Sequence, residues 1–120
     1  MNLRIVCLAT CLCLATATAG ADQAEREINH LIERVEESDC VYIRNGSEHD
    51  AESAADHLRL KYRRGKRYVD TAEHFIDRLA SESSWTGDAY ELRCGDVTEP
   101  AADWLHRELR RYRGVAPSGD

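Results

Sequence analysis

The sequence predicts a single, mainly α-helical domain in which about four amphipathic helices pack around a minimal two-stranded β ribbon. Three observations point to this class. Apolar residues recur at helical spacing in four separate segments, two short runs are rich in β-branched and aromatic residues, and two cysteines remain beyond an N-terminal leader. Each predicted strand carries one of these cysteines, so we expect a single disulfide, Cys40–Cys94, to join the strands or their ends.

Residues 1–21 have the features of a secretion signal peptide. Arg4 gives a short positive start, Ile5 to Ala15 form an apolar core, and small residues follow. We expect cleavage after Ala21, with Ala19 as the second choice. The apolar run is too short to span a bilayer as a helix. The sequence therefore predicts a soluble, exported, periplasmic protein without a transmembrane segment.

Removal of the leader leaves 99 of the 120 residues and a net charge of −7, because Arg4 is the only charged residue removed from a chain of net charge −6. A domain of this size is marginally stable without a cross-link. A Cys40–Cys94 bridge closes a loop of about 55 residues and contributes roughly 4 kcal/mol in the chain-entropy model. Since the chain has no Cys-x-x-Cys motif, we interpret the pair as structural.

The first predicted helix and the first predicted strand follow the leader. Asp22 is a candidate N-cap for the helix. Its apolar face consists of Ala24, Ile28, Leu31, Ile32 and Val35. Cys40 to Ile43 is the first predicted strand. A turn over Arg44–Ser47 ends it, because the Asn-Gly pair tolerates positive φ.

The second and third predicted helices are joined by a basic connector over residues 63–68, which Gly65 interrupts. The second helix begins near Ser47 or Asp50, and its face is mostly alanine: Ala51, Ala54, Ala55, Leu58 and Tyr62. Asp70 and Glu73 have the spacing of a capping box for the third helix. The buried face expected there is Ala72, Phe75, Ile76, Leu79 and Ala80.

The remaining segments are a loop, a strand and a helix. Residues 81–88 form the loop, and Ala89 to Cys94 alternate as expected of the second strand. The fourth helix begins near Thr98 or Pro100, with Ala101, Trp104, Leu105, Leu109 and Tyr112 on one face. We expect one helical domain over residues 22–113 and a disordered tail over residues 114–120.

Several blocks of sequence in this order are similar to one known family. They are Arg44-Asn45-Gly46-Ser47-Glu48-His49, His57-Leu58-Arg59-Leu60-Lys61, Asp70-Thr71-Ala72-Glu73-His74-Phe75-Ile76-Asp77, Ala80-Ser81-Glu82-Ser83-Ser84 and Thr86-Gly87-Asp88-Ala89-Tyr90. The chain resembles the YfeK-like family, domain of unknown function 5329, over essentially all of its mature length. The family pattern has Lys-Pro at Asp88-Ala89, so the turn before the second strand is expected to differ in shape. The resemblance implies a small exported envelope protein and no known activity.

The turn over Arg44–His49 is the strongest candidate for a binding site. It combines a guanidinium, an amide, a carboxylate and an imidazole, from Arg44, Asn45, Glu48 and His49. Backbone N–H groups at the start of the following helix favour an anion there. The alternative is structural: Arg44 pairs with Glu48, the Asn-Gly pair turns the chain, and Ser47 caps the helix.

His57 and the loop over Ser83–Tyr90 are further candidates. His57 is either a site residue or a half-buried side chain hydrogen-bonded to the loop after the third helix. Asp50, Ser53 and His57 share one helix face, but neighbours on one face do not converge as a hydrolytic triad requires. Trp85 either is an exposed binding residue or folds back onto the core, and Tyr90 follows it as a candidate.

These features favour a non-catalytic periplasmic binding or accessory module acting through the Arg44–His49 turn and the Ser83–Tyr90 loop. The alternatives are a small envelope hydrolase with a histidine base, which needs Glu48 or Glu73 beside a histidine, and a metal- or anion-binding protein. No catalytic residue, metal ligand set or cofactor is predicted. The basic run over residues 61–67 resembles a nucleic-acid patch, but export and net negative charge exclude nucleic acid. The expected partner is an envelope protein or polymer.

Overall fold

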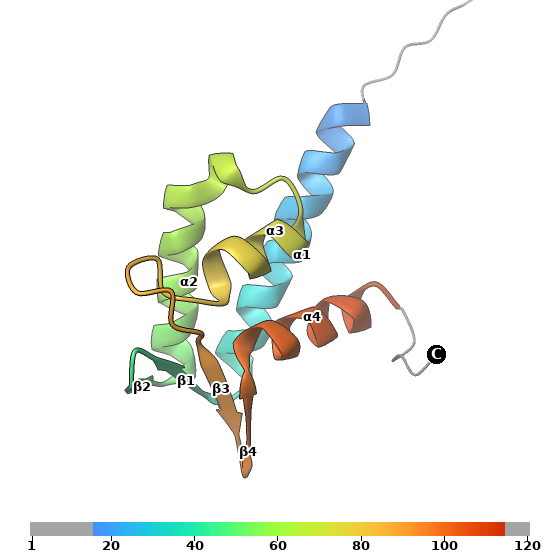
Figure 1. Ribbon diagram of the computed structural model, residues 1–120. Coiled ribbons are helices and arrows are strands. Elements are labelled where there is room, and N and C mark those ends of the chain that lie inside the picture. Colours follow the sequence, from blue (N-terminus) through green and yellow to red (C-terminus); the bar gives the residue numbers. More distant parts are fainter. Residues whose placement is uncertain (1–15, 115–120) are drawn as a thin grey trace, which may run out of the picture.

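The computed structural model describes residues 16–114 as helices on one side of a small sheet (Figure 1). Ten elements occur in the order α1 (Thr16–Glu37), β1 (Val41–Arg44), β2 (Ser47–His49), α2 (Ala51–Gly65), η1 (Lys66–Tyr68), α3 (Ala72–Phe75), η2 (Ile76–Ala80), β3 (Glu91–Cys94), β4 (Val97–Pro100) and α4 (Ala101–Tyr112). The predicted signal peptide lies mostly outside these residues, and so does the predicted tail apart from Gly114.

The helices enclose one apolar core. α1 and α2 lie side by side, and α3, η2 and α4 pack on them (Figure 1). Alanines at the face of α2 allow α1 to approach closely, since Ala54 and Ala55 are almost fully buried. The largest fully buried side chains are Tyr42, Phe75, Ile28, Leu31, Ile32, Leu58, Ile76, Leu92, Leu105, Leu109 and Val35. The predicted apolar faces therefore form the core.

The sheet is larger than the predicted two-stranded ribbon. It has four antiparallel strands in the order β2-β1-β3-β4. The expected pair, β1 with β3, forms its centre, with Tyr42 opposite Leu92. The two strands missing from the prediction, Ser47–His49 and Val97–Pro100, are short, polar and mostly exposed. Neither shows the apolar alternation by which a strand is recognised in sequence.

The disulfide between Cys40 and Cys94 is present, with an S–S distance of 2.05 Å and a Cα–Cα distance of 4.5 Å. Val41 lies opposite Arg93 in the register of β1 and β3, so the two cysteines continue this ladder by one step. A Cα separation near 4.5 Å is that of a non-hydrogen-bonded antiparallel pair. The bridge therefore joins the two central strands, as predicted.

Two helix starts and the form of the third helix differ from the prediction. Asp22 lies inside α1, which already begins at Thr16, so it is not the N-cap. Thr71 rather than Asp70 caps α3, and its hydroxyl accepts a hydrogen bond from the His74 N–H at 3.0 Å. The third helix is also short, because α3 passes after one turn into the π-helix η2. Within the described residues, no helix has the length and apolar content needed to cross a membrane.

Candidate functional site

A groove of about 550 Å³ opens between the β1–β2 turn, the face of α2 and the loop after η2. Its volume lies in the range of ordinary small-molecule sites. Twelve residues line it: Arg44, Asn45, His57, Lys61, Arg64, Gly65, Tyr68, Leu79, Ser83, Ser84, Trp85 and Tyr90. Five of the seven residues predicted from the sequence are in this set, namely Arg44, Asn45, His57, Trp85 and Tyr90.

The β1–β2 turn places Arg44 and Asn45 at one end of the groove. Asn45 and Gly46 both have positive φ, at 50° and 79°. This is the geometry of a two-residue type I′ hairpin turn, in which an Asn-Gly pair is favoured. Arg44 is the last residue of β1, so the sheet fixes its backbone. The local sequence therefore builds a rigid support for both side chains.

Hydrogen bonds join the two segments that were predicted to act together. The amide oxygen of Asn45 accepts from the Thr86 hydroxyl at 3.0 Å, and its nitrogen lies 3.5 Å from Ser83 Oγ. Ser83 is buried, and its Oγ also accepts from the backbone N–H groups of Trp85 and Thr86 at 3.2 and 3.3 Å. The loop therefore has a defined shape before any ligand arrives.

His57 lies half-buried in the groove wall as a neutral imidazole. Burial, followed by the charges of Arg44 and Lys61 and the neighbouring His49, lowers the pKa of His57 to about 4. Among the described residues, His57 Nε2 and Arg44 Nε are both buried without a hydrogen-bond partner. The alternative in which His57 hydrogen-bonds to the loop after the third helix is therefore not observed at Nε2. Two unpaired polar atoms in one groove are unusual, because buried polar groups are normally hydrogen-bonded.

Lys61, a lining residue of the groove, is held by two hydrogen-bond acceptors and one aromatic ring. Its Nζ donates to the Glu82 carbonyl and to the Tyr90 hydroxyl, each at 3.2 Å, and lies 5.0 Å from the centroid of the Tyr90 ring. These contacts leave its charge without a carboxylate partner, since Lys61 forms no salt bridge within residues 16–114. Tyr90 therefore acts as a support for Lys61.

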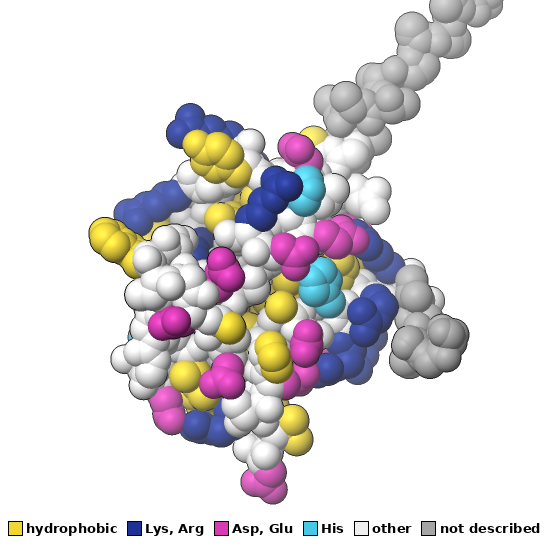
Figure 2. Space-filling view, viewed as in Figure 1, with side chains coloured by type: hydrophobic (Ala, Val, Ile, Leu, Met, Phe, Trp, Pro, Cys, Tyr) yellow, Lys and Arg dark blue, Asp and Glu magenta, His cyan; other side chains and the backbone are white. Residues whose placement is uncertain are grey.

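Two exposed aromatic side chains lie at the groove. Trp85 is 94% exposed and Tyr68 is 58% exposed. Figure 2 shows hydrophobic and basic side chains next to each other along the left edge of the molecule, over the C-terminal end of α2 and the loop after η2. Of the two alternatives for Trp85, the exposed position is the one observed.

Glu48 and His49, the other two predicted residues, do not line the groove. Glu48 pairs with Arg93 on the sheet, at 2.9 and 3.1 Å, so the alternative Arg44–Glu48 ion pair is not formed. Arg93 lowers the pKa of this carboxyl. Partial burial and the charge of Arg44 lower the pKa of His49. Ser47 belongs to β2, and Asp50 instead caps α2 by accepting from the Ser53 N–H at 2.8 Å.

The groups required by the hydrolase hypothesis do not come together in the described part of the chain. Glu73 pairs with Arg113 at 2.7 Å, away from the groove, and Glu48 is held by Arg93. Asp50 is occupied as a helix cap, so no carboxylate orients His57. A search of residues 16–114 for groups of three or more metal-ligating side chains finds none.

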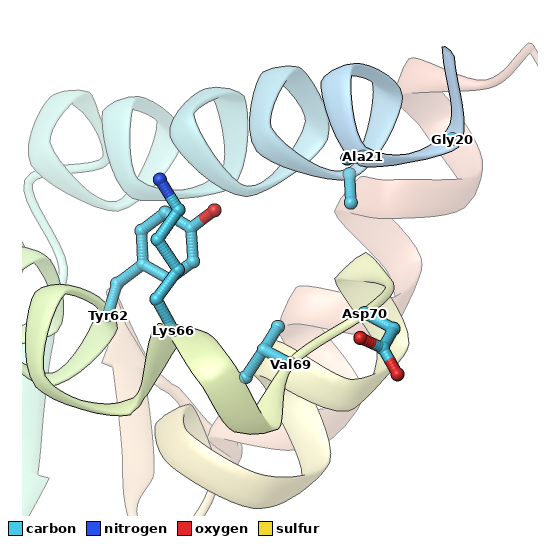
Figure 3. Close-up of a pocket in the computed structure, with 7 residues that line it drawn as sticks. Gly20, Ala21, Tyr62, Lys66, Val69 and Asp70 are labelled. Atoms are coloured by element: carbon cyan, nitrogen blue, oxygen red, sulfur yellow. The ribbon is translucent and has the colours of Figure 1, made fainter. Parts of the chain in front are cut away.

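A second hollow, of about 450 Å³, lies between the start of α1 and the end of α2. Figure 3 shows Tyr62 and Lys66 from α2 and η1, with Val69 and Asp70 beyond them, on the side facing Gly20 and Ala21. Gly20 and Ala21 belong to the predicted leader. The predicted cleavage after Ala21 would remove this part of the wall, so we do not take this hollow as the site.

Sequence reasoning did not combine Lys61, Arg64 and Tyr68 with His57. The signal was present, because these residues follow one another at intervals of four, three and four. Such intervals place side chains on one stripe of a helix. The basic run over residues 61–67 was instead considered as a whole, as a nucleic-acid patch, and was set aside with that partner.

Comparison with known proteins gives a family and no activity. A family model described as "Family of unknown function (DUF5329)" matches residues 22–113. The chain belongs to this family. A relative from Salmonella typhimurium, "Uncharacterized protein YfeK", is 41% identical over 91 residues, which cover 72% of this chain and 75% of the relative. The resemblance seen in the sequence is thus confirmed. No solved structure matches the chain.

Proposed function

We propose that this member of the family is a non-catalytic periplasmic binding module that holds an anionic ligand in the groove. One observation carries the proposal. Arg44, Lys61 and Arg64 line the groove, and none of its lining residues is Asp or Glu. A carboxylate or phosphate group entering there meets several positive charges at once, and charge-assisted hydrogen bonds of this kind are the strong ones.

The unpaired polar atoms support the same proposal. Arg44 Nε is a buried donor without an acceptor. Leaving a donor unsatisfied costs about 1–3 kcal/mol. A ligand that accepts from this N–H removes that cost. The pKa of His57 is lowered first by burial and then by the charges of Arg44 and Lys61. An anion bound beside the imidazole opposes the effect of these charges.

The disulfide and the family boundary support export. A Cys40–Cys94 bridge is stable in an oxidising compartment such as the periplasm. The family match begins at residue 22, directly after the proposed cleavage position. The mass of the protein purified after expression from its full-length gene tests this part. Cleavage after Ala21 leaves a chain that begins at Asp22.

A titration followed by NMR tests the binding site. The protein isolated from the periplasmic fraction is titrated with sodium phosphate and with sodium acetate, and sodium chloride keeps the ionic strength constant. We expect saturable shifts in residues 44–46, 57–65 and 83–90. A rise in the pKa of His57 should accompany saturation, because the bound anion stabilises the imidazolium.

Matched variants distinguish binding in the groove from general electrostatic attraction of anions to the protein. Arg44→Gln and Arg64→Gln remove groove charges, whereas Arg110→Gln removes one exposed charge from α4. The two groove variants should weaken binding of phosphate and acetate, and the α4 variant should not. Equal weakening in all three, or shifts that rise linearly without saturation, contradicts the proposal. Thermal unfolding establishes that each variant is folded.

A further inference from the structure

The groove combines three cations with two exposed aromatic side chains, and this combination narrows the class of anion. Binding of a simple inorganic anion would need only the cations of the groove and no aromatic side chain. Trp85 has almost its whole surface in water, although a Trp is normally among the more buried residues of a protein. Exposed aromatic side chains at a pocket are typical contact residues, because their large rings lose little entropy on binding.

Hydrogen bonds within the loop fix the backbone at Trp85 on the wall of the groove. The backbone N–H of Trp85 donates to the buried Ser83 Oγ at 3.2 Å, and Asn45 fixes the same loop through Thr86 at 3.0 Å. Tyr68 lies on the α2 side of the same groove, with the Arg67 guanidinium 5.1 Å from its ring centroid. A ligand in the groove therefore meets an aromatic face and a positive charge together.

The unpaired His57 Nε2 adds a requirement for hydrogen bonding. In a neutral imidazole this nitrogen either donates or accepts, according to the tautomer. A hydroxyl group satisfies both tautomers, whereas a carboxylate satisfies only the donor. Ser84 and Asn45 add further polar groups to the lining. A ligand rich in hydroxyl groups fits this part of the groove better than one that carries only charge.

We propose that the ligand is an acidic oligosaccharide, an inference that rests on the proposed function. A sugar ring stacks with its C–H face on Trp85, its hydroxyl groups reach His57 and Ser84, and its acidic groups lie on Arg44, Lys61 and Arg64. The proposal deepens the anion-binding function by naming the chemistry of the molecule that carries the anion.

Two other polymers fit the groove less well. A peptide commonly binds by adding a strand to a free sheet edge. β1, which leads into the groove, is already paired on both sides, with β2 and β3. A nucleic acid also offers stacking and anionic groups, but a strand that extends beyond the groove meets a chain whose net charge is −7 after removal of the predicted leader. A short acidic oligosaccharide lies within the groove and meets less of this repulsion.

Binding of defined probes tests the inference. Trigalacturonate is compared with maltotriose, tetraglutamate, a tetrathymidylate and acetate, using the protein purified from the periplasm. We expect trigalacturonate to bind about tenfold or more tightly than any other probe, a difference of about 1.4 kcal/mol. The indole signal of Trp85 should shift on binding, and that of the buried Trp104 should not.

Variants identify the contact with the ring. Trp85→Ala should lower the affinity for trigalacturonate to about that for acetate and leave acetate binding unchanged, because the indole contacts only the sugar. Trp85→Tyr should retain most of the affinity, since tyrosine also offers an aromatic face. Arg44→Gln should weaken both probes. Since Trp85 is exposed, its variants are expected to fold normally.

The results distinguish this inference from the function on which it rests. The oligosaccharide proposal is wrong if tetraglutamate or tetrathymidylate binds as tightly as trigalacturonate. It is also wrong if Trp85→Ala leaves the affinity for trigalacturonate unchanged. If acetate and phosphate still saturate the groove in that case, the anion-binding function stands. If no probe saturates the groove, both proposals are wrong.

Discussion

The cations of α4 and the cations of the groove are arranged in opposite ways. At α4, Arg113 pairs with Glu27 and Glu73, each at 2.7 Å, and Arg107 pairs with Glu99 at 2.6 Å. Glu108, almost fully buried, is shared by Arg34 and Arg111. At the groove, Arg44, Lys61 and Arg64 have no such partners within residues 16–114.

This difference separates charges that hold the fold together from charges that remain free for a ligand. The two Arg113 pairs join segments distant in sequence, since Glu27 is in α1 and Glu73 is in α3. Among the groove cations, Lys61 is held by neutral groups instead, a carbonyl oxygen and a tyrosine hydroxyl. We therefore expect substitutions at the two places to affect different properties.

The largest effect is expected from removing the disulfide that links the two regions. Cys40 precedes β1, which leads into the groove, and Cys94 ends β3, which leads through β4 into α4. Replacing both cysteines by serine should lower the free energy of unfolding by about 4 kcal/mol in the chain-entropy model. Chemical denaturation of the oxidised protein and the double variant measures it. A loss under about 1 kcal/mol would mean that the sheet alone maintains the strand pairing.

A smaller loss is expected at the α4 pairs, and it provides the sharpest test of the comparison. Arg113→Ala leaves the buried Glu27 carboxylate without its main partner, which costs about 2–3 kcal/mol. Arg64→Ala, the matched control in the groove, should change the free energy of unfolding by less than about 0.5 kcal/mol. Urea denaturation of both variants gives the two values. Similar losses of unfolding free energy in the two variants would contradict the difference proposed between the two sets of cations.

The pH dependence of the free energy of unfolding in acid should also depend on the Arg113–Glu27 ion pair. Arg113 lowers the pKa of Glu27, so the ionised carboxylate stabilises the fold above its ordinary pKa of 4.5. This contribution is lost as the pH falls through the lowered folded-state value. In Arg113→Ala the lowering of the Glu27 pKa is removed, so the acid-side fall in the free energy of unfolding should be smaller than in wild type, as denaturation curves at several pH values would show.

The smallest effect is expected at His57. Its folded-state pKa of about 4 lies below the ordinary 6.5, so the unfolded chain binds the proton more readily. The stability due to neutral His57 is complete above pH 6.5 and is lost progressively as the pH falls toward 4. His57→Gln should flatten the stability curve between these values. Because the ring is only half-buried, the change should be about 1 kcal/mol or less.

Denaturation curves at several pH values measure this difference, and wild type remains the reference for the other titrating groups. His49 and the lowered carboxyls, such as Glu27 and Glu73, are present in both proteins and cancel. Parallel curves for the two proteins over this range would show that His57 is not held neutral by the groove. Saturating phosphate should reduce the difference, because it opposes the charges of Arg44 and Lys61.

Most of the core could be predicted from the sequence, because apolar spacing records burial directly. Leu31 and Phe75 are fully buried, as their positions on the helix faces indicate. The outer strands could not be predicted, since Ser47–His49 and Val97–Pro100 have no buried side chain. What makes them strands is pairing with β1 and β3, which is a tertiary effect.

The groove was predictable in its parts and not as a whole. Arg44 and Trp85 were selected because of their residue types, but the sequence places them 41 positions apart. The hydrogen bonds of Asn45 to Thr86 and Ser83 bring these segments together, and no local pattern predicts them. Glu48 was misplaced for a related reason. Its partner, Arg93, becomes a neighbour only when β1 pairs with β3.

The two outer strands also affect how copies of the protein behave in concentrated solution. An exposed sheet edge offers unpaired N–H and C=O groups to another chain and so promotes aggregation. Here β2 has only three residues, including the charged Glu48, and β4 ends at Pro100, which has no N–H to donate. Each edge of the described sheet is thus too short or too interrupted to template a further strand. The two outer strands, which were not predicted from the sequence, therefore protect the sheet from pairing with strands of other molecules.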